Sequence, residues 1–258
     1  MINTKKIAVA ALKQLDLGSA IAVRLTKITG KSKIPIHPKH LLTETPWFTR
    51  YLGKKDVVLD LGCGNGQNSV KAARFAKKVT GVDINDKSLE IAKKSALHLK
   101  IKNILFQKLN LEKELHFKNE MFDKILLLDV LEHLYKREQI LAEIHRILKK
   151  AGILLLAVPN SETSWKKLQR SAGICSFSDP DHKIEFSEEQ IIELLKKHGF
   201  SIKHFGYGYF DTPLRGLFDV IGGFSQGTYK KLSQWRRKKV QQKPTEAGGF
   251  EIVCTTQK

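Results

Sequence analysis

One short stretch, residues 57–66, constrains the fold of this chain more than any other. It reads Val-Val-Leu-Asp-Leu-Gly-Cys-Gly-Asn-Gly: apolar residues around an acid, then glycine at every second position. This pattern predicts a buried strand that runs into a tight turn, and the helical pattern from Gln67 completes a strand–loop–helix unit. Gly62, Gly64 and Gly66 leave bare main chain, so a flat or bulky ligand can approach the backbone closely.

From residue 57 onward, strand-like and helix-like patterns alternate, which is typical of a parallel sheet with helices on both faces. The expected strands are 57–61, 78–83, 104–108, 123–129, 152–158, 201–207 and a final alternating segment at 250–256. The expected helices lie near 67–76, 86–99, 136–149 and 187–198. We therefore predict an α/β fold with a doubly wound, mostly parallel, Rossmann-like sheet.

Three segments fall outside this alternation. The leader that precedes it is rich in lysine, and two amphipathic helical patterns recur in it, near 4–17 and 19–28. We expect this leader to pack against the main domain, to cover a substrate as a lid, or to lie on a membrane. The predicted organisation is a basic helical leader or cap at 1–45 and a main domain at 46–258, with insertions at about 159–186 and 211–249.

The 258-residue chain carries a net charge of +19, and the charge is uneven. Residues 1–56 hold 11 basic and 3 acidic side chains, and residues 201–258 hold 10 and 4. Such asymmetry indicates that the ends face something anionic: nucleic acid, a lipid surface or an acidic substrate. The alternative is that the lysines only keep the protein in solution.

The cysteines and the apolar runs bear on metal binding, disulfide formation and cellular location. Cys63, Cys175 and Cys254 are far apart with no C-x-x-C spacing, so neither a zinc site nor a disulfide framework is indicated, and no metal is expected. A reducing, cytoplasmic location is the simplest expectation. The longest apolar run, Ile153 to Val158, is too short to cross a bilayer, and Ile7 to Leu12 is too short for a secretory signal.

A second acid, Asp83, indicates which kind of ligand the glycine turn binds. Asp83 ends the second expected strand about 20 residues after Gly62. At this place a carboxylate can accept hydrogen bonds from both hydroxyls of an adenosine ribose. Ile84 beside it can lie against an adenine. Asp83 could instead cap the helix that begins near residue 86, but that role leaves the glycine turn unexplained. The glycine spacing is one residue short of the dinucleotide fingerprint, which disfavours an NAD-linked oxidoreductase.

At this point the sequence resembles class I S-adenosylmethionine-dependent methyltransferases, in their small-molecule branch. The resemblance covers roughly Trp47 to Phe205. It rests on DLGCGNG (60–66), GVDIN (81–85), FDKILLLDVLEHL (122–134), GILLLAVPN (152–160) and HKIEFSEEQIIELLKKHGF (182–200), taken together. It implies S-adenosyl-L-methionine as cofactor and a seven-stranded sheet with one antiparallel strand, a place that the segment at 250–256 fits.

The resemblance also implies roles for ten residues of this chain. They are Asp60, Gly62, Cys63 and Gly64 at the methionine end of the cofactor, Asp83 at the ribose, Ile84, Asn110 and Leu111 at the adenine, and Leu128 and Asp129 near the methionine moiety. At Asn110 the family usually has an acid that accepts from the adenine amino group. An amide oxygen can accept the same hydrogen bond, so binding should survive.

Methyl transfer asks little of the protein, because the leaving thioether is neutral and the rate comes mainly from positioning the nucleophile. An oxygen nucleophile must also lose its proton, so a general base helps. His133, which follows the fourth strand next to Glu132, and His182 in the long connection are the candidates for this catalytic role. The ordinary alternatives are that Glu132 and His133 begin the next helix and that His182 is a loop histidine.

The sequence therefore predicts an enzyme that methylates a small-molecule acceptor at oxygen, with lipid-like molecules among the candidate acceptors. The apolar stripe from Leu214 to Phe224, followed by the basic run at 235–239, adds a possible peripheral contact with an anionic membrane. The alternative interpretation is a nucleic-acid or protein methyltransferase that uses the basic termini to hold its substrate. The segment at 129–133 lacks the Asn/Asp-Pro-Pro-aromatic motif of base methyltransferases, which weighs against it. The third interpretation is a non-catalytic binding module with the cofactor fold. The sequence does not indicate the oligomeric state.

Overall fold

The computed structural model describes residues 4–33, 35–42 and 45–256, and the chain divides into two compact units. The larger unit comprises Thr45–Val158, Phe186–Gly206 and Phe250–Lys258. The smaller unit comprises Met1–Glu44, Pro159–Glu185 and Tyr207–Gly249.

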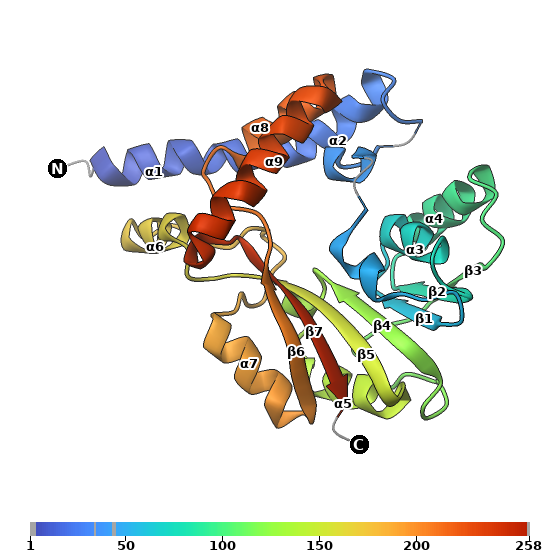
Figure 1. Ribbon diagram of the computed structural model, residues 1–258. Coiled ribbons are helices and arrows are strands. Elements are labelled where there is room, and N and C mark those ends of the chain that lie inside the picture. The colour runs from blue at the N-terminus through green and yellow to red at the C-terminus, as the bar shows by residue number, and fades with distance from the viewer. Residues whose placement is uncertain (1–3, 34, 43–44, 257–258) are drawn as a thin grey trace. The chain divides into compact units, whose positions relative to one another are not determined.

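The larger unit is built on a seven-stranded sheet in the order β3-β2-β1-β4-β5-β7-β6. The strands are β1 (Val57–Leu61), β2 (Lys78–Asp83), β3 (Ile104–Lys108), β4 (Phe122–Leu128), β5 (Leu148–Pro159), β6 (Phe200–Tyr207) and β7 (Gly249–Thr256). The pairs from β3 to β5 are parallel, and β7 runs opposite to β4 (Figure 1). This confirms the predicted doubly wound, mostly parallel seven-stranded sheet.

The sheet buries both of its faces, as its strand sequences require. Val58, Leu59 and Leu61 of β1 are fully buried, which is why this strand is nearly continuous in apolar residues rather than alternating. One core cluster joins Val58 of β1 and Leu126 of β4 to Phe48, which lies in a short 3₁₀ helix before the sheet. Burial of such apolar surface is the main stabilising term of the unit.

The helices of the larger unit cover the sheet from both sides. They are α3 (Gln67–Ala73), α4 (Asp86–His98), α5 (Arg137–Ile147) and α7 (Glu188–Lys197). The crossovers through α3 and α4 lead outward from β1 to β2 and β3, whereas α5 leads the other way from β4 to β5. Since such crossovers are right-handed, the two sets lie on opposite faces. The predicted N-terminus of α7 is a capping box between Ser187 and Gln190.

The one strand whose start differs clearly from the sequence prediction is β5, which begins at Leu148 rather than 152. Phe122 pairs with Leu148, but Lys124 pairs with Ile153, so the register shifts between these pairs. The extra residues form a bulge in which Ala151 adopts a φ of +56°. The lysines of this bulge interrupt the apolar pattern, which is why the pattern predicts a strand start only after them.

The smaller unit is helical in its described residues. Its helices are α1 (Thr4–Gln14), α2 (Gly18–Ile28), α6 (Ser164–Ser171), α8 (Arg215–Phe224) and α9 (Gln226–Gln242), with 3₁₀ turns at Leu15–Leu17, Pro38–Leu41 and Pro244–Glu246. α2 packs along α8 (Figure 1). Ser19 of α2 donates to Asp219 of α8 at 2.5 Å, and Thr29 donates to the carbonyl of Gly223 at 2.8 Å.

The unit therefore brings together the leader and both predicted insertions, which are far apart in the sequence. The boundaries predicted from the sequence, 1–45 and 46–258, remain a prediction. Among the described residues, no helix combines the length and apolar character needed to span a lipid bilayer.

Candidate cofactor site at the ends of strands β1, β2 and β4

The strand order reverses between β1 and β4, because the chain leaves β1 toward β2 and leaves β4 toward β5. In open parallel sheets, ligands bind at the carboxyl ends of the strands that flank such a reversal. Asp60 and Gly62 stand at the end of β1, and Leu128 and Asp129 stand at the end of β4, which pairs directly with β1. Four predicted cofactor residues therefore lie on the two sides of this point.

The glycine turn at the end of β1 is built of left-handed backbone. Gly62, Gly64 and Gly66 have φ values of +70°, +50° and +74°, a region that side-chain-bearing residues seldom adopt. Space also requires glycine at two of them. A Cβ on Gly62 would lie 2.6 Å from a methyl carbon of Val130, and one on Gly66 would lie 2.7 Å from the Cβ of Ala92. The turn can keep this close packing only with glycine.

Asp83 is held at the end of β2 by two backbone donors. The N–H of Gly64 donates to Oδ2 at 2.8 Å, and the N–H of Asn85 donates to Oδ1 at 2.8 Å. Each carboxylate oxygen keeps a further lone pair for a ligand hydroxyl. The residue that caps α4 is Asn85, whose side chain accepts from the N–H of Ser88 at 3.1 Å. Capping therefore does not account for Asp83, which is instead joined to the glycine turn.

Asp60, the residue before the last one of β1, has a buried side chain that is only 2% exposed. Burial raises its pKa from 3.8 to about 7; a hydrogen bond donated by Ser69 opposes the shift, and the negative charge of Asp83 adds to it. A cation bound beside this carboxyl would favour its ionised form, because the positive charge would replace the solvation that the group has lost. The amino group and sulfonium of a methionine-type ligand are cations of this kind.

Cys63 lies between the two glycines, and its side chain is nearly buried. Burial raises the pKa of its thiol, and the charges of Asp60 and Asp83 raise it further. The thiol is therefore protonated at neutral pH, which excludes a nucleophilic thiolate at this position. Its backbone N–H donates to the carbonyl of Val82 at 2.9 Å, so the residue ties the end of β1 to the end of β2.

The predicted adenine and methionine residues differ in exposure. Ile84 is 58% exposed next to Asp83, and Leu111 is buried. The side-chain oxygen of Asn110 accepts from the N–H of Glu112 at 2.9 Å, which leaves it one lone pair for the predicted adenine contact. Asp129 is exposed with a φ of +57°, and such strained backbone concentrates at functional sites.

The two candidate bases belong to different units. His133 ends a 3₁₀ turn (Leu131–His133) directly after β4; it is half-buried, and Glu132 beside it is buried. The ordinary alternative for this pair was that it starts the next helix, but α5 begins only at Arg137. His182 belongs to the smaller unit, where its Nδ1 lies 2.8 Å from a carboxylate oxygen of Glu185.

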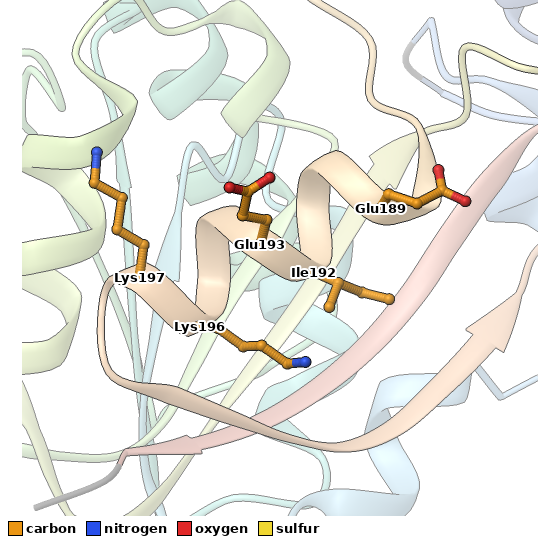
Figure 2. A pocket seen from close by; sticks show the side chains of 5 residues that line it. All are labelled: Glu189, Ile192, Glu193, Lys196 and Lys197. Carbon is orange, nitrogen blue, oxygen red and sulfur yellow. The ribbon is translucent and has the colours of Figure 1, made fainter.

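A hollow on the outer side of α7 is a separate feature. Five residues of that helix line it: Glu189, Ile192, Glu193, Lys196 and Lys197 (Figure 2). Its two glutamates precede its two lysines along the helix, and none of the predicted site residues contributes to it. We assign it no role in cofactor binding.

Two residues of the site were missed by the sequence reading. Ser69 in α3 donates to Asp60, and Val130 fills the space opposite Gly62. The position of Ser69 in the first turn after the glycines could have suggested it, because that turn faces the end of the preceding strand. Nothing in the sequence marks Val130, whose contact depends on how β4 pairs with β1.

Comparison with known proteins identifies the family of this chain. Residues 52–199, more than half of the chain, match the sequence model of a family described as a methyltransferase domain. A probable S-adenosylmethionine-dependent methyltransferase of Mycolicibacterium smegmatis is 26% identical over 68% of this chain and 66% of its own length. A ubiquinone biosynthesis O-methyltransferase of Pelagibacter ubique is 31% identical over 40% of this chain and 42% of its own length.

The chain thus spans between about two fifths and two thirds of these curated relatives. Among solved structures, a SAM-dependent methyltransferase from Methanosarcina mazei superposes with a TM-score of 0.58 at 22% identity. The superposition covers 83% of this chain and 99% of that one, which shows a common fold.

Proposed function

The chain belongs to the methyltransferase domain family, and on this premise we propose that it transfers a methyl group from S-adenosyl-L-methionine to an oxygen of a small-molecule acceptor. The membership confirms the resemblance to class I S-adenosylmethionine-dependent methyltransferases that the sequence motifs indicate. The choice of oxygen is supported by the relative named for O-methylation in ubiquinone biosynthesis.

The observation that carries the proposal is the joined pair of Gly64 and Asp83. The 2.8 Å hydrogen bond between them fixes an acid at the end of β2 against a bare backbone turn at the end of β1. Gly62 and Gly64 offer main-chain groups to a ligand, and Asp60 offers a buried carboxylate for its positive charge. A nucleoside that carries a cationic amino acid matches these three features together.

The cofactor supplies a methyl group on a sulfonium, which leaves as part of a neutral thioether. The residues of the chain then have two tasks: to hold the cofactor through Asp60, Asp83 and the glycine turn, and to take the proton of the acceptor hydroxyl. We propose His133 or His182 as the base, since a neutral imidazole nitrogen can take that proton near neutral pH. Ile84, Asn110, Leu111, Leu128 and Asp129 are proposed to complete the cofactor site.

Calorimetry tests the cofactor part of the proposal. Titration with S-adenosyl-L-methionine and with its demethylated product should show binding of both to the unaltered chain. Asp83→Ala should weaken binding by roughly 10- to 100-fold, because a charged hydrogen-bond acceptor for the ligand is lost, about 1.5–3 kcal/mol. Asp86→Asn, a change at an exposed acid three residues away, is the matched control and should leave affinity unaltered. No binding to the unaltered chain, or equal binding to the Asp83→Ala variant, would remove the proposal.

We further propose that the smaller unit lets the protein reach a lipid-like acceptor at an anionic membrane. α8 leaves large apolar side chains exposed: Leu217 is 43% and Phe224 59% exposed. Helix α9 adds exposed lysines at 230, 231 and 238. An amphipathic surface with lysines binds anionic bilayers through both apolar insertion and charge. Arg236 and Arg237 of the predicted basic run contribute less, because both stack over Tyr209 within the unit.

Vesicle sedimentation tests the membrane part. The chain should sediment with vesicles that contain phosphatidylglycerol and remain in the supernatant with vesicles of phosphatidylcholine alone. Phe224→Ser should reduce sedimentation, whereas Leu97→Ser, which removes an 80% exposed leucine from α4 in the larger unit, should not. Equal sedimentation of the two variants would contradict the assignment of this surface.

A further inference from the structure

Glu112, in the loop after β3, joins two segments of the larger unit next to the predicted cofactor residues. Its Oε1 accepts from the N–H of Tyr135 at 2.7 Å, and its Oε2 accepts from the N–H of Lys136 at 3.0 Å. These two residues lie directly before α5, where Lys136 occupies the N-cap position. Hydrogen bonds to a charged acceptor are stronger than those between neutral groups. One carboxylate therefore ties the loop after β3 to the start of α5.

The segment that begins at Glu112 is also anchored to α5 at its far end. Arg146 of α5 donates to the carbonyls of Leu115 and Phe117, each at 2.8 Å. Glu112 is the anchor at the end nearer the cofactor site, since Asn110 lies only two residues before it. Loss of the Glu112 carboxylate would therefore release the near end, while the contacts of Arg146 hold the far end in place.

The turn that contains Asn110 is held from the other side by β2. The N–H of Leu109 donates to the carbonyl of Asp83 at 2.9 Å, and Asp83 is the proposed ribose ligand. Within the turn, the N–H of Lys113 donates to the carbonyl of Asn110 at 3.1 Å. Asn110 thus lies between two fixed points of the larger unit, Asp83 at the end of β2 and Glu112 at the start of α5.

The backbone of Glu112 fixes the direction of the Asn110 amide. The N–H of Glu112 lies 2.9 Å from the end of this amide, and because an N–H can only donate, the atom that it faces is the oxygen and not the nitrogen. A flipped amide would bring two donors together. The oxygen keeps one lone pair, and the NH₂ group has no acceptor among the residues that the structure describes. Asn110 therefore offers a ligand one acceptor and one donor, in fixed positions.

We infer that Glu112 is a positioning residue that holds the Asn110 amide in the orientation that fits adenine and rejects hypoxanthine, its deaminated counterpart. The inference rests on the proposed function, with Asn110 at the base of the cofactor. Adenine presents an amino donor beside a ring-nitrogen acceptor, and an amide can pair with both. In hypoxanthine an oxygen acceptor replaces the amino donor, so the Asn110 oxygen would face another acceptor. A flipped amide could pair with that oxygen, but the N–H of Glu112, held in place by its own carboxylate, prevents the flip.

Calorimetry with two ligands tests the inference: the demethylated cofactor and its deaminated analogue, which differ only in the base. The unaltered chain should bind the adenine ligand roughly 10- to 100-fold more tightly. Glu112→Ala should reduce this preference to about threefold or less, because the released amide can adapt to either base. Glu112→Gln keeps the shape and one accepting oxygen, so its loss of preference should be smaller. Glu114→Ala removes an exposed acid two residues further along the chain and is the matched control, which should keep the full preference.

Amide hydrogen exchange of the same variants, without ligand, shows whether the turn has been released. In Glu112→Ala the amides of Tyr135 and Lys136 should exchange faster, whereas the amides of β4 should keep their protection if the variant is folded. A preference for adenine that persists in Glu112→Ala with these two amides released would overturn the positioning role. Equal affinity of the unaltered chain for the two ligands would overturn the inference and leave the proposed function standing. Binding of neither ligand would instead remove the proposed function.

Discussion

Asp60→Asn should stabilise the protein while it weakens the cofactor site. Asp60 is buried, and its pKa in the folded chain is about 7, against 3.8 as the ordinary value. The folded state therefore holds the proton more tightly than the unfolded state. The contribution of Asp60 to stability is therefore most favourable below about pH 4, where both states hold the proton, and it becomes less favourable as the pH rises to about 7, where the folded state also ionises. Above that pH the unfavourable contribution is constant.

The size of the effect follows from the shift of about three pKa units. At about 1.4 kcal/mol per unit, ionised Asp60 destabilises the fold by about 4 kcal/mol at pH 8. At pH 5, only about one unit above the unfolded pKa, the contribution is roughly 2 kcal/mol. An asparagine carries no charge at either pH, and its amide oxygen can still accept from Ser69.

Scanning calorimetry measures the prediction. For a chain of this size each kcal/mol shifts the melting temperature by roughly 2–4 °C, so Asp60→Asn should raise it by about 10 °C at pH 8 and about 5 °C at pH 5. Asp181→Asn, which neutralises an exposed acid in the smaller unit, should change it by little at either pH. A lower melting temperature for Asp60→Asn at pH 8, or an equal gain at both pH values, would refute this account of Asp60.

Three further results follow from the same site and from the smaller unit. Affinity for S-adenosyl-L-methionine should rise as the pH rises through about 7 and then level off, because ionised Asp60 attracts its positive charge; calorimetry with no such rise would contradict this. Gly62→Ala should lower the free energy of unfolding by about 1–3 kcal/mol, since its methyl group meets Val130 in left-handed backbone; denaturant titration that shows no loss would contradict it. Lys166→Met should destabilise the chain by about 3–5 kcal/mol at neutral pH, because Glu185 stays buried without its partner, and by less in acid, where that carboxyl can take up a proton; a loss independent of pH would contradict it.

The sheet could be predicted from the sequence because its signals are local. Strands buried on both faces leave continuous apolar runs, as in β1, and glycine marks the turn that follows. The bounds of β1 (Val57–Leu61), β2 (Lys78–Asp83) and β3 (Ile104–Lys108) match the predicted ones. The early start of β5 could not be read, because the bulge at Ala151 puts polar residues inside a strand.

Some features of the site could also be predicted from the sequence, and others could not. The placement of Asp83 followed from spacing along the chain, and the structure joins it to Gly64. The raised pKa of Asp60 and the buried pair of Lys166 and Glu185 have no comparable signal, because burial depends on contacts between segments distant in sequence. Lys166 and Lys167 are indistinguishable in the sequence, but in α6 Lys166 is buried and Lys167 is exposed.

Incubation of the protein with methyl-deuterated S-adenosyl-L-methionine and a cell extract, followed by untargeted mass spectrometry, tests the central claim most directly. We predict a small molecule that gains a deuterated methyl group on oxygen, formed together with the demethylated cofactor, and the loss of both signals with the Asp83→Ala variant. Bound cofactor with no labelled product would contradict methyl transfer and favour a binding module. A label found on nucleic acid or protein would contradict the small-molecule acceptor.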